Sequence, residues 1–465
     1  MTDELHYLSA AQLLGHFRAR TLSPVEVVTA ILQRIAAINP KVNAIASLDA
    51  EGALQAAREA ERRWFHGAPR GQLDGVPITL KDSFPNTQIA VFHGTLAHTS
   101  VGDESSGDAP VVARLKEHGA VILATTTMPD WGMIASGLSS RYGITRNPWD
   151  LDRNPGGSSS GSGVALASGF GALSVGTDIG GSLRIPSAFC GTFALKPTYG
   201  RVPYHDPAPW LVAGPMARSA ADCALMMNVI TLPDRRDDTA LAYEAADYHD
   251  GLAKGVSGLR IALLPEIGFG PAIDPQIHAA LLDAGRKLQE MGAIVDIAPP
   301  IFEADPEPHF DRYVHVDSYL RFARLPAEEQ DKLLPLIANW CRRIVTENPV
   351  DLMTAMVELG PIRRRIARAF AQIDYILLPT MGMLPYAAHL PWPPNDFGAH
   401  NPYCFPFNIS EQPAAAFNGG FSREGLPIGL QIVGRRTDDR GVLQVAAACE
   451  QLLGLGDARP TFRRS

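Results

Sequence analysis

The sequence predicts an α/β fold in which helices cover a mostly parallel sheet. The main observation is that helical and strand-like patterns alternate along the chain, which is typical of βαβ units. A helix over 110–118 followed by a β-run over 120–124 is one example. A run over 259–264, a helix over 274–291 and a run over 293–297 form another. Apolar residues make up 46% of the 465 residues, enough for a large core.

The N-terminal part, residues 8–65, predicts three helices. Two lie over 8–38, and the second begins with a capping box of Ser23 and Glu26, with a proline at the first helical position. Asn39 and the proline after it are expected to end this helix. An alanine-rich helix follows over about 49–65.

The stretch from about 70 to 232 combines short strands, helices and long loops. Two segments without periodicity, 86–108 and 126–155, are expected to be loops, and a loop as long as the second is usually functional. The expected strands are 76–81, 173–176 and 193–196, and the expected helices are 181–189 and one that Ser219 caps and that runs to about 230.

The rest of the chain continues in the same style. A charged connector over 232–257 leads to the βαβ unit, and a mainly helical excursion over about 305–372 follows. Because strands on both sides of the connector alternate with helices, residues 1–465 are predicted to form one domain. The expected closing elements, over about 374–454, are strands at 374–378 and 426–433, proline-rich loops at 380–412 and an amphipathic helix at 438–453.

The composition argues against several classes of protein. The 41 basic and 49 acidic residues give a net charge of −8, unlike a binder of nucleic acid or anionic membranes. The acidic N-terminus lacks the apolar run of a signal peptide, and the longest apolar run, over 164–175, is too short to span a bilayer. Five scattered cysteines without a CxxC pair indicate reduced thiols, no metal site and a cytoplasmic protein.

The segment 154–187 has the most unusual composition, with Gly/Ser-rich turns on either side of an apolar run. Such turns expose backbone N–H groups that stabilise negative charge. The first turn lacks the lysine and the spacing of a phosphate-binding loop. It does contain Gly-x-Ser-x-Gly centred on Ser159. Because two prolines rather than a strand precede it, a hydrolase with Ser159 as nucleophile is only an alternative.

The second turn suits a nucleophile better. A strand-like run precedes the residues GTDIGGS and a helix is expected after them, so Ser182 is placed at a helix N-terminus, where N–H groups stabilise an oxyanion. A buried lysine with a lowered pKa is a suitable base, and Lys81 at the end of an expected strand is a candidate. Taken alone, the lysine is better explained as a surface strand end, and a helix cap is also a common role for a serine such as Ser182.

Four motifs, in order along the chain, resemble the amidase signature family. They are GVPITLKDSF, NPWDLDRNPGGSSSGSG, GTDIGGSLRIPSAFCGTFALKPTYG and GLPIGLQIVG. The resemblance extends from Leu8 to about Gly454 and is weakest over about 235–370. It implies a single α/β domain whose large, mixed, mostly parallel central sheet has helices on both faces. It also implies an amide hydrolase that uses no metal and no cofactor.

The resemblance also implies a Ser–cis-Ser–Lys triad. Lys81 would be the base, Ser182 the nucleophile that forms an acyl-enzyme, and Ser158 the bridging serine beside a cis peptide bond. The oxyanion would be held by the backbone N–H groups of Ile179, Gly180, Gly181 and Ser182.

Side chains from several loops are expected to shape the substrate pocket. They favour a small apolar or aryl amide, anilide or carbamate (urethane), with an ester as a further candidate. Arg184 either reads a substrate carboxylate or, the favoured interpretation, pairs with Asp178. The expected pocket residues are Trp131, Met133, Tyr142, Trp210, Tyr403 and Phe405.

The family also contains the glutamine-hydrolysing subunit of the tRNA-dependent amidotransferase, which is the main alternative. That subunit usually carries an SSLDQ-like segment after KPTYG, and this sequence has none there. A free-standing hydrolase acting on a small molecule is therefore favoured, with a homodimer left open.

Overall fold

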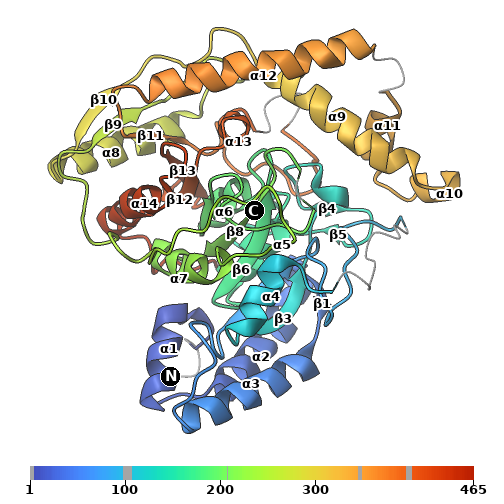
Figure 1. Ribbon diagram of the computed structural model, residues 1–465, viewed down its shortest axis with the longest axis vertical. Coiled ribbons are helices and arrows are strands. Elements are labelled where there is room, and N and C mark those ends of the chain that lie inside the picture. Colours follow the sequence, from blue (N-terminus) through green and yellow to red (C-terminus); the bar gives the residue numbers. More distant parts are fainter. Residues whose placement is uncertain (1–4, 98–106, 207, 344–347, 394–400, 465) are drawn as a thin grey trace.

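The computed structural model describes residues 5–97, 107–206, 208–343, 348–393 and 401–464. Within them, one sheet of eleven strands runs through the molecule (Figure 1). A short hairpin of β4 (Leu138–Ser139) and β5 (Gly143–Ile144) lies apart from it. The strands, in their order across the sheet, are β1 (Ile45–Leu48), β3 (Val121–Thr126), β2 (Pro77–Lys81), β6 (Leu173–Asp178), β8 (Val212–Ala217), β7 (Phe193–Lys196), β12 (Ala414–Phe421), β13 (Pro427–Val433), β11 (Tyr375–Pro379), β9 (Arg260–Leu263) and β10 (Ile294–Ile297).

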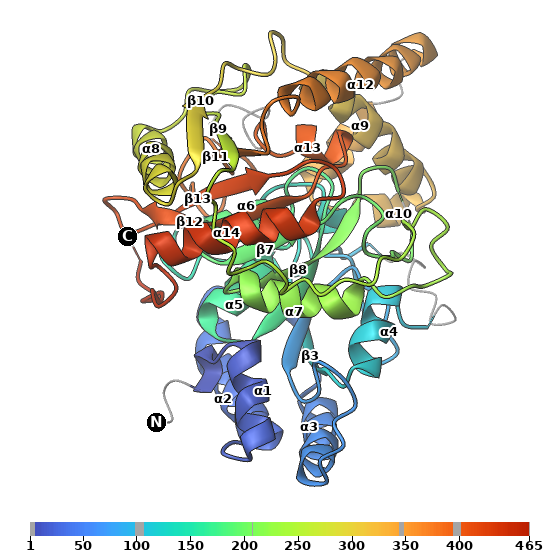
Figure 2. The same cartoon turned by 60° about the vertical axis from the view of Figure 1, so that its left-hand side comes forward.

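Helices cover both faces of the sheet, as the sequence predicts. Figure 2 shows α7, α8 and α14 on the near face, while α5 and α6 pack against the other. The helices are α1 (Ala10–Ala19), α2 (Pro24–Val42), α3 (Ala50–Phe65), α4 (Pro110–Glu117), α5 (Ser160–Ser168), α6 (Arg184–Cys190), α7 (Ala220–Ile230), α8 (Pro275–Glu290), α9 (Glu307–Ala323), α10 (Ala327–Gln330), α11 (Pro335–Arg343), α12 (Pro349–Ala369), α13 (Pro406–Ile409) and α14 (Asp439–Leu453).

The α/β class and the mixed sheet are confirmed, but parallel pairing does not predominate. Strands β3, β2 and β6 are parallel neighbours, as are β11, β9 and β10. The other pairings in the sheet are antiparallel. The expectation fails because no sequence pattern indicates β8 or β12, two antiparallel strands rich in Gly, Ala or Pro, which have low β-propensity.

The N-terminal helices form largely as predicted. Ser23 and Glu26 make the expected capping box at the start of α2. The prediction that Asn39 and Pro40 end this helix is wrong, because α2 continues to Val42. Proline has a helical φ, and the Asn39 side chain accepts hydrogen bonds from the N–H groups just beyond the helix end, so a proline in the last turn is tolerated.

The helical excursion forms α9 to α12. Figures 1 and 2 show these helices gathered at the end of the molecule opposite α1 to α3. Of the described residues, none belongs to a helix long and apolar enough to cross a membrane.

Candidate active site

Lys81 and Thr177 meet because β2 and β6 are parallel neighbours, which places the carboxyl ends of both strands at the same edge of the sheet. Lys81 is the last residue of β2 and is 1% exposed. Its Nζ donates to Thr177 Oγ1 at 2.8 Å and to Ser158 Oγ at 2.7 Å. The peptide bond between Gly157 and Ser158 is cis.

The environment of Lys81 favours the neutral amine. Burial lowers the pKa of Lys81 from 10.5 to about 7, and the negative charge of Asp178 opposes this shift only in part. A large fraction of the side chain is therefore neutral near pH 7. A neutral amine bonded to a serine hydroxyl can accept its proton.

Ser182 lies in the turn between β6 and α6. The prediction that a helix begins at this turn needs correction, since α6 starts only at Arg184 and Ser182 precedes it by two residues. The carboxylate of Asp178 organises the turn by accepting from the N–H groups of Gly181, at 2.8 Å, and Leu183, at 3.1 Å. Among the described residues, no hydrogen bond joins the hydroxyls of Ser182 and Ser158.

The expected oxyanion donors are only partly available. The N–H of Gly181 is already bonded to Asp178, which removes it from the expected set. The N–H groups of Ile179, Gly180 and Ser182 donate to no other group in the described part of the chain, and all three residues line the cavity described below. These three donors suit an oxyanion held beside Ser182.

Arg184 is a buried partner of Asp178, not a contact to substrate. It is 0% exposed, and its Nε and Nη2 each donate to the Asp178 carboxylate at 3.0 Å. Burial disfavours the charged carboxylate, but the guanidinium outweighs this effect and holds the pKa of Asp178 far below its ordinary value. The structure therefore supports the pairing interpretation and not the substrate-binding one.

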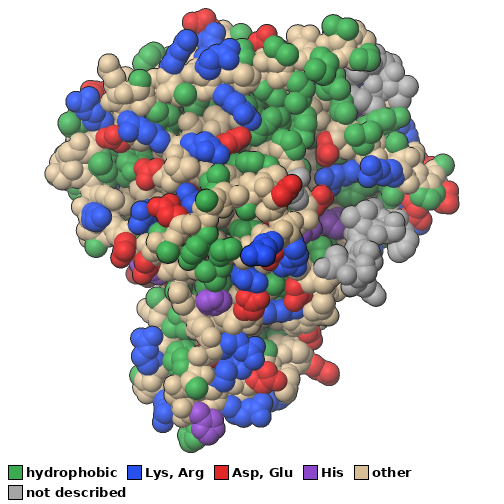
Figure 3. Space-filling view, viewed as in Figure 1, with side chains coloured by type: hydrophobic (Ala, Val, Ile, Leu, Met, Phe, Trp, Pro, Cys, Tyr) green, Lys and Arg blue, Asp and Glu red, His purple; other side chains and the backbone are tan. Residues whose placement is uncertain are grey.

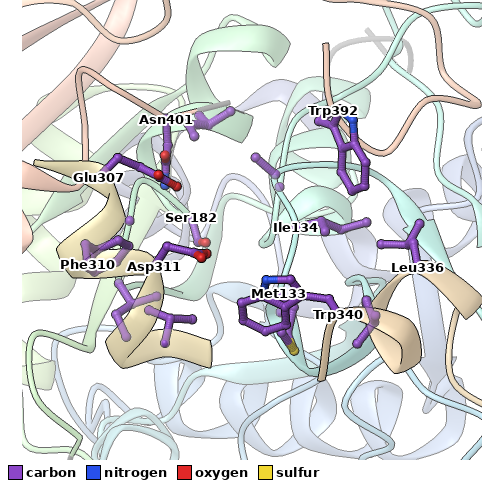
Figure 4. A pocket seen from close by; sticks show the side chains of 18 of the residues that line it. Met133, Ile134, Ser182, Glu307, Phe310, Asp311, Leu336, Trp340, Trp392 and Asn401 are labelled. Atoms are coloured by element: carbon purple, nitrogen blue, oxygen red, sulfur yellow. The ribbon is translucent and has the colours of Figure 1, made fainter. Parts of the chain in front are cut away.

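A cavity of about 340 Å³ opens above Ser182 (Figure 4). Loop residues 132–135, the Ser182 turn and helices α9 and α11 form its walls. Its apolar lining includes Met133, Ile134, Ile185, Phe310, Val314, Leu336, Ile337, Trp340 and Trp392, and its polar or charged lining includes Ser182, Glu307, Asp311, Arg343 and Asn401.

Only some of the expected pocket residues reach this cavity. Met133 lines it. Phe405 and Trp210 are buried behind the lining, with the Phe405 ring stacked 5.0 Å from the Phe310 centroid and the Trp210 ring 6.3 Å from it. These two residues support a wall of the cavity without facing it.

The other three aromatic residues point elsewhere. Tyr142 donates to Asp82 Oδ2 at 2.8 Å, and Tyr403 donates to the carbonyl of Pro265 at 3.3 Å. Trp131 packs in an apolar cluster with α11 residues beside the cavity. Tyr142 and Tyr403 lie in turns and Trp131 in a short 3-10 helix (Asp130–Gly132), and a loop sequence does not indicate the direction of a side chain.

Ser159 lies outside the cavity. It is 0% exposed, its Oγ donates to the Thr177 carbonyl at 3.3 Å, and its N–H donates to the Ser182 carbonyl at 3.1 Å. Helix α5 follows it, but no strand leads into the turn. This geometry does not match a nucleophile elbow.

Comparison with known proteins identifies the family. The family model described as Amidase matches residues 26–443. The chain belongs to the amidase signature family. This amidase signature protein is 32% identical over 478 residues to an acylamidase from Rhodococcus erythropolis, covering 99% of this chain and 98% of the relative. It is 34% identical over 484 residues to a subunit of the glutamyl-tRNA(Gln) amidotransferase of Myxococcus xanthus, covering 96% and 98%.

A solved structure agrees with this assignment. A bacterial aryl acylamidase of the amidase signature family matches with a TM-score of 0.89 at 27% identity, covering 98% of this chain and 99% of that one. The amidase signature fold and the hydrolase class follow from these matches.

Proposed function

We propose that this chain hydrolyses the C–N bond of a small apolar or aryl amide, anilide or carbamate, with Ser182 as nucleophile. The observation that carries the proposal is the contact of the buried Lys81, whose pKa burial lowers to about 7, with Ser158 beside a cavity that Ser182 lines. Lys81 lies at the carboxyl end of β2 and Ser182 in the turn that follows β6, its parallel neighbour, so the proposed relay runs from Ser182 through Ser158 to Lys81.

The reaction proceeds in two steps. Lys81 accepts the Ser158 proton, Ser158 accepts that of Ser182, and Ser182 attacks the carbonyl carbon. The N–H groups of Ile179 and Gly180, with that of Ser182, stabilise the oxyanion. The relay returns a proton to the leaving amine as the C–N bond breaks, and water then hydrolyses the acyl-enzyme.

The apolar lining supports the substrate class. Aromatic and aliphatic side chains surround much of the cavity, and the similar proteins include an acylamidase and an aryl acylamidase. An ester or a urethane presents the same carbonyl to Ser182 and is a further substrate candidate. The five buried, free cysteines suit a reducing compartment, and we propose a cytoplasmic location.

A glutaminase role within a larger complex is the second candidate, because a glutamyl-tRNA(Gln) amidotransferase component shares 34% of aligned residues with this chain. Glutaminase activity above that on anilides, together with co-purifying partner chains, would favour it.

The proposal is tested by burst kinetics and mass spectrometry with a hexanoyl 4-nitroanilide and the matching 4-nitrophenyl ester. We expect an acyl adduct on Ser182, with activity at least about 10³-fold lower in Ser182→Ala and Lys81→Met. Ser159→Ala is the matched control and should remain active. An adduct on Ser159, or full activity in Ser182→Ala, would refute the proposal.

A further inference from the structure

Two carboxylates lie on the cavity wall formed by α9. Glu307 and Asp311 are four residues apart, so they lie one helical turn apart on the same face of the helix. Both line the cavity above Ser182 and are partly buried. A catalytic relay of Lys81, Ser158 and Ser182 has no role for either of them.

Asn401 adds a third acceptor to this wall. It is 7% exposed and lines the cavity, and its Oδ1 is buried without a hydrogen-bond partner among the residues that the structure describes. Its amide packs directly on Gly180, where a Cβ atom would lie only 2.8 Å from Asn401 Nδ2. A buried acceptor without a partner is unfavourable by about 1–3 kcal/mol, so a ligand that donates a hydrogen bond here is stabilised.

The three polar side chains lie on one side of the cavity, and part of the apolar lining lies on the opposite side. Figure 4 shows Asn401, Glu307 and Asp311 on one side, with Ser182 near them, and Trp392, Ile134 and Leu336 across the space. Arg343 from α11 supplies a positive charge to the lining as well. Arg343 and both carboxylates also interact with other protein groups, so a ligand would join an existing network.

We infer that the substrate is an amide that carries a protonated amine as well as an apolar group. This inference rests on the proposed function and specifies its substrate class. The ammonium lies along α9, where it donates to Glu307, Asp311 and Asn401, while the apolar group faces Trp392 and Leu336. Partial burial makes the attraction between carboxylate and ammonium stronger than it is in water.

The test uses two isosteric pairs of amides. The first pair is the 4-nitroanilides of 5-aminopentanoic and hexanoic acids, which differ in the acyl part. The second pair is N-(4-aminobutyl)benzamide and N-pentylbenzamide, which differ in the amine part. In each pair an ammonium replaces a methyl group, so the pair that discriminates shows which part of the substrate lies along α9.

Binding to Ser182→Ala by calorimetry separates recognition from catalysis. We expect the ammonium compound of one pair to bind at least about tenfold more tightly than its isostere, a difference of about 1.4 kcal/mol. Glu307→Gln, Asp311→Asn and Asn401→Leu, each added to Ser182→Ala, should reduce this preference at least threefold. Asp317→Asn is the matched control, since Asp317 is on α9 but pairs with Arg321 at the surface, and it should leave the preference unchanged.

The inference would be overturned if the two members of each pair bound with equal affinity. It would also be overturned if Glu307→Gln and Asp311→Asn weakened the binding of both members of a pair equally. A different result would refute the proposed function: no turnover of the amides and no acyl adduct on Ser182 in the wild-type protein. Tight, selective binding of the ammonium compound without turnover would refute the reaction and support the recognition.

Discussion

At the scale of single residues, burial sets the chemistry of the candidate site. Lys81 is enclosed at the end of β2, and its only direct partners among the described residues are two hydroxyls. The carboxylate of Asp178, which would otherwise keep the lysine charged, is engaged by Arg184 and by backbone N–H groups. The lysine can therefore act as a base near neutral pH.

The pKa of Lys81 predicts the pH dependence of the reaction. Since only the neutral amine accepts a proton, kcat/KM should rise about tenfold per pH unit below pH 7 and level off above it. The measurement is kcat/KM for the hexanoyl anilide from pH 5 to 9.5. A profile still rising at pH 9.5 would show an ordinary lysine pKa and contradict this assignment.

At the scale of elements, α9 and α11 form two walls of the cavity above Ser182. They contribute both its acidic wall and much of its apolar wall. The two helices are joined by His315, whose ring stacks on Trp340 with centroids 4.2 Å apart and whose Nε2 lies 2.5 Å from the Trp340 carbonyl oxygen. A change in either helix should therefore alter substrate affinity more than the chemical step.

Trp340→Ala tests this role of α11. Loss of the indole removes apolar contact of about 1.5–3 kcal/mol, so kcat/KM for the hexanoyl anilide should fall about tenfold to a hundredfold, mainly through KM. Leu320→Ala serves as control, because Leu320 is on α9 but is 52% exposed. A variant that remains folded by circular dichroism, with kcat/KM within twofold of wild type, would contradict the prediction.

At the scale of the whole molecule, the sheet joins distant parts of the chain. The C-terminal strands β12 and β13 lie between β7 and β11, in the middle of the sheet order. Most residues of these central strands are buried, whereas helices α9 to α12 lie at one end and expose Leu320, Val350 and Met353. Figure 3 shows basic and acidic side chains interspersed over much of the same view of the molecule.

This difference in burial predicts the order of local opening. Backbone amides in α9 and α11 should exchange with deuterium at least about a hundredfold faster than those of β6, β7 and β13, because helices that pack on one side open at a lower free energy than central strands. Hydrogen exchange with mass spectrometry measures both sets in one sample. Equal protection in the two regions would show that the helices open only when the sheet unfolds.

The sequence predicted much of the fold from local pattern. Helical periodicity and capping residues predicted α2, α3, α7, α8 and α14, and apolar runs predicted β2, β3, β9 and β13. It did not indicate β8 or β12, because Gly, Ala and Pro have low β-propensity. It did not indicate the buried helix α5 either, because this helix begins with Ser and Gly, which are poorer helix formers than Ala, and has no exposed polar face. Burial among neighbouring elements, a long-range effect, stabilises these segments.

For the candidate site, the sequence by itself determined which residues to examine, since Lys81, Ser158 and Ser182 lie in short motifs with recognisable chemistry. Only the tertiary structure decided the rest. It removed the Gly181 N–H from the oxyanion donors, paired Arg184 with Asp178, and built the cavity from α9 and α11. The physical reason is that a motif constrains its own backbone, whereas the direction of a loop side chain and the position of a helix depend on packing against distant residues.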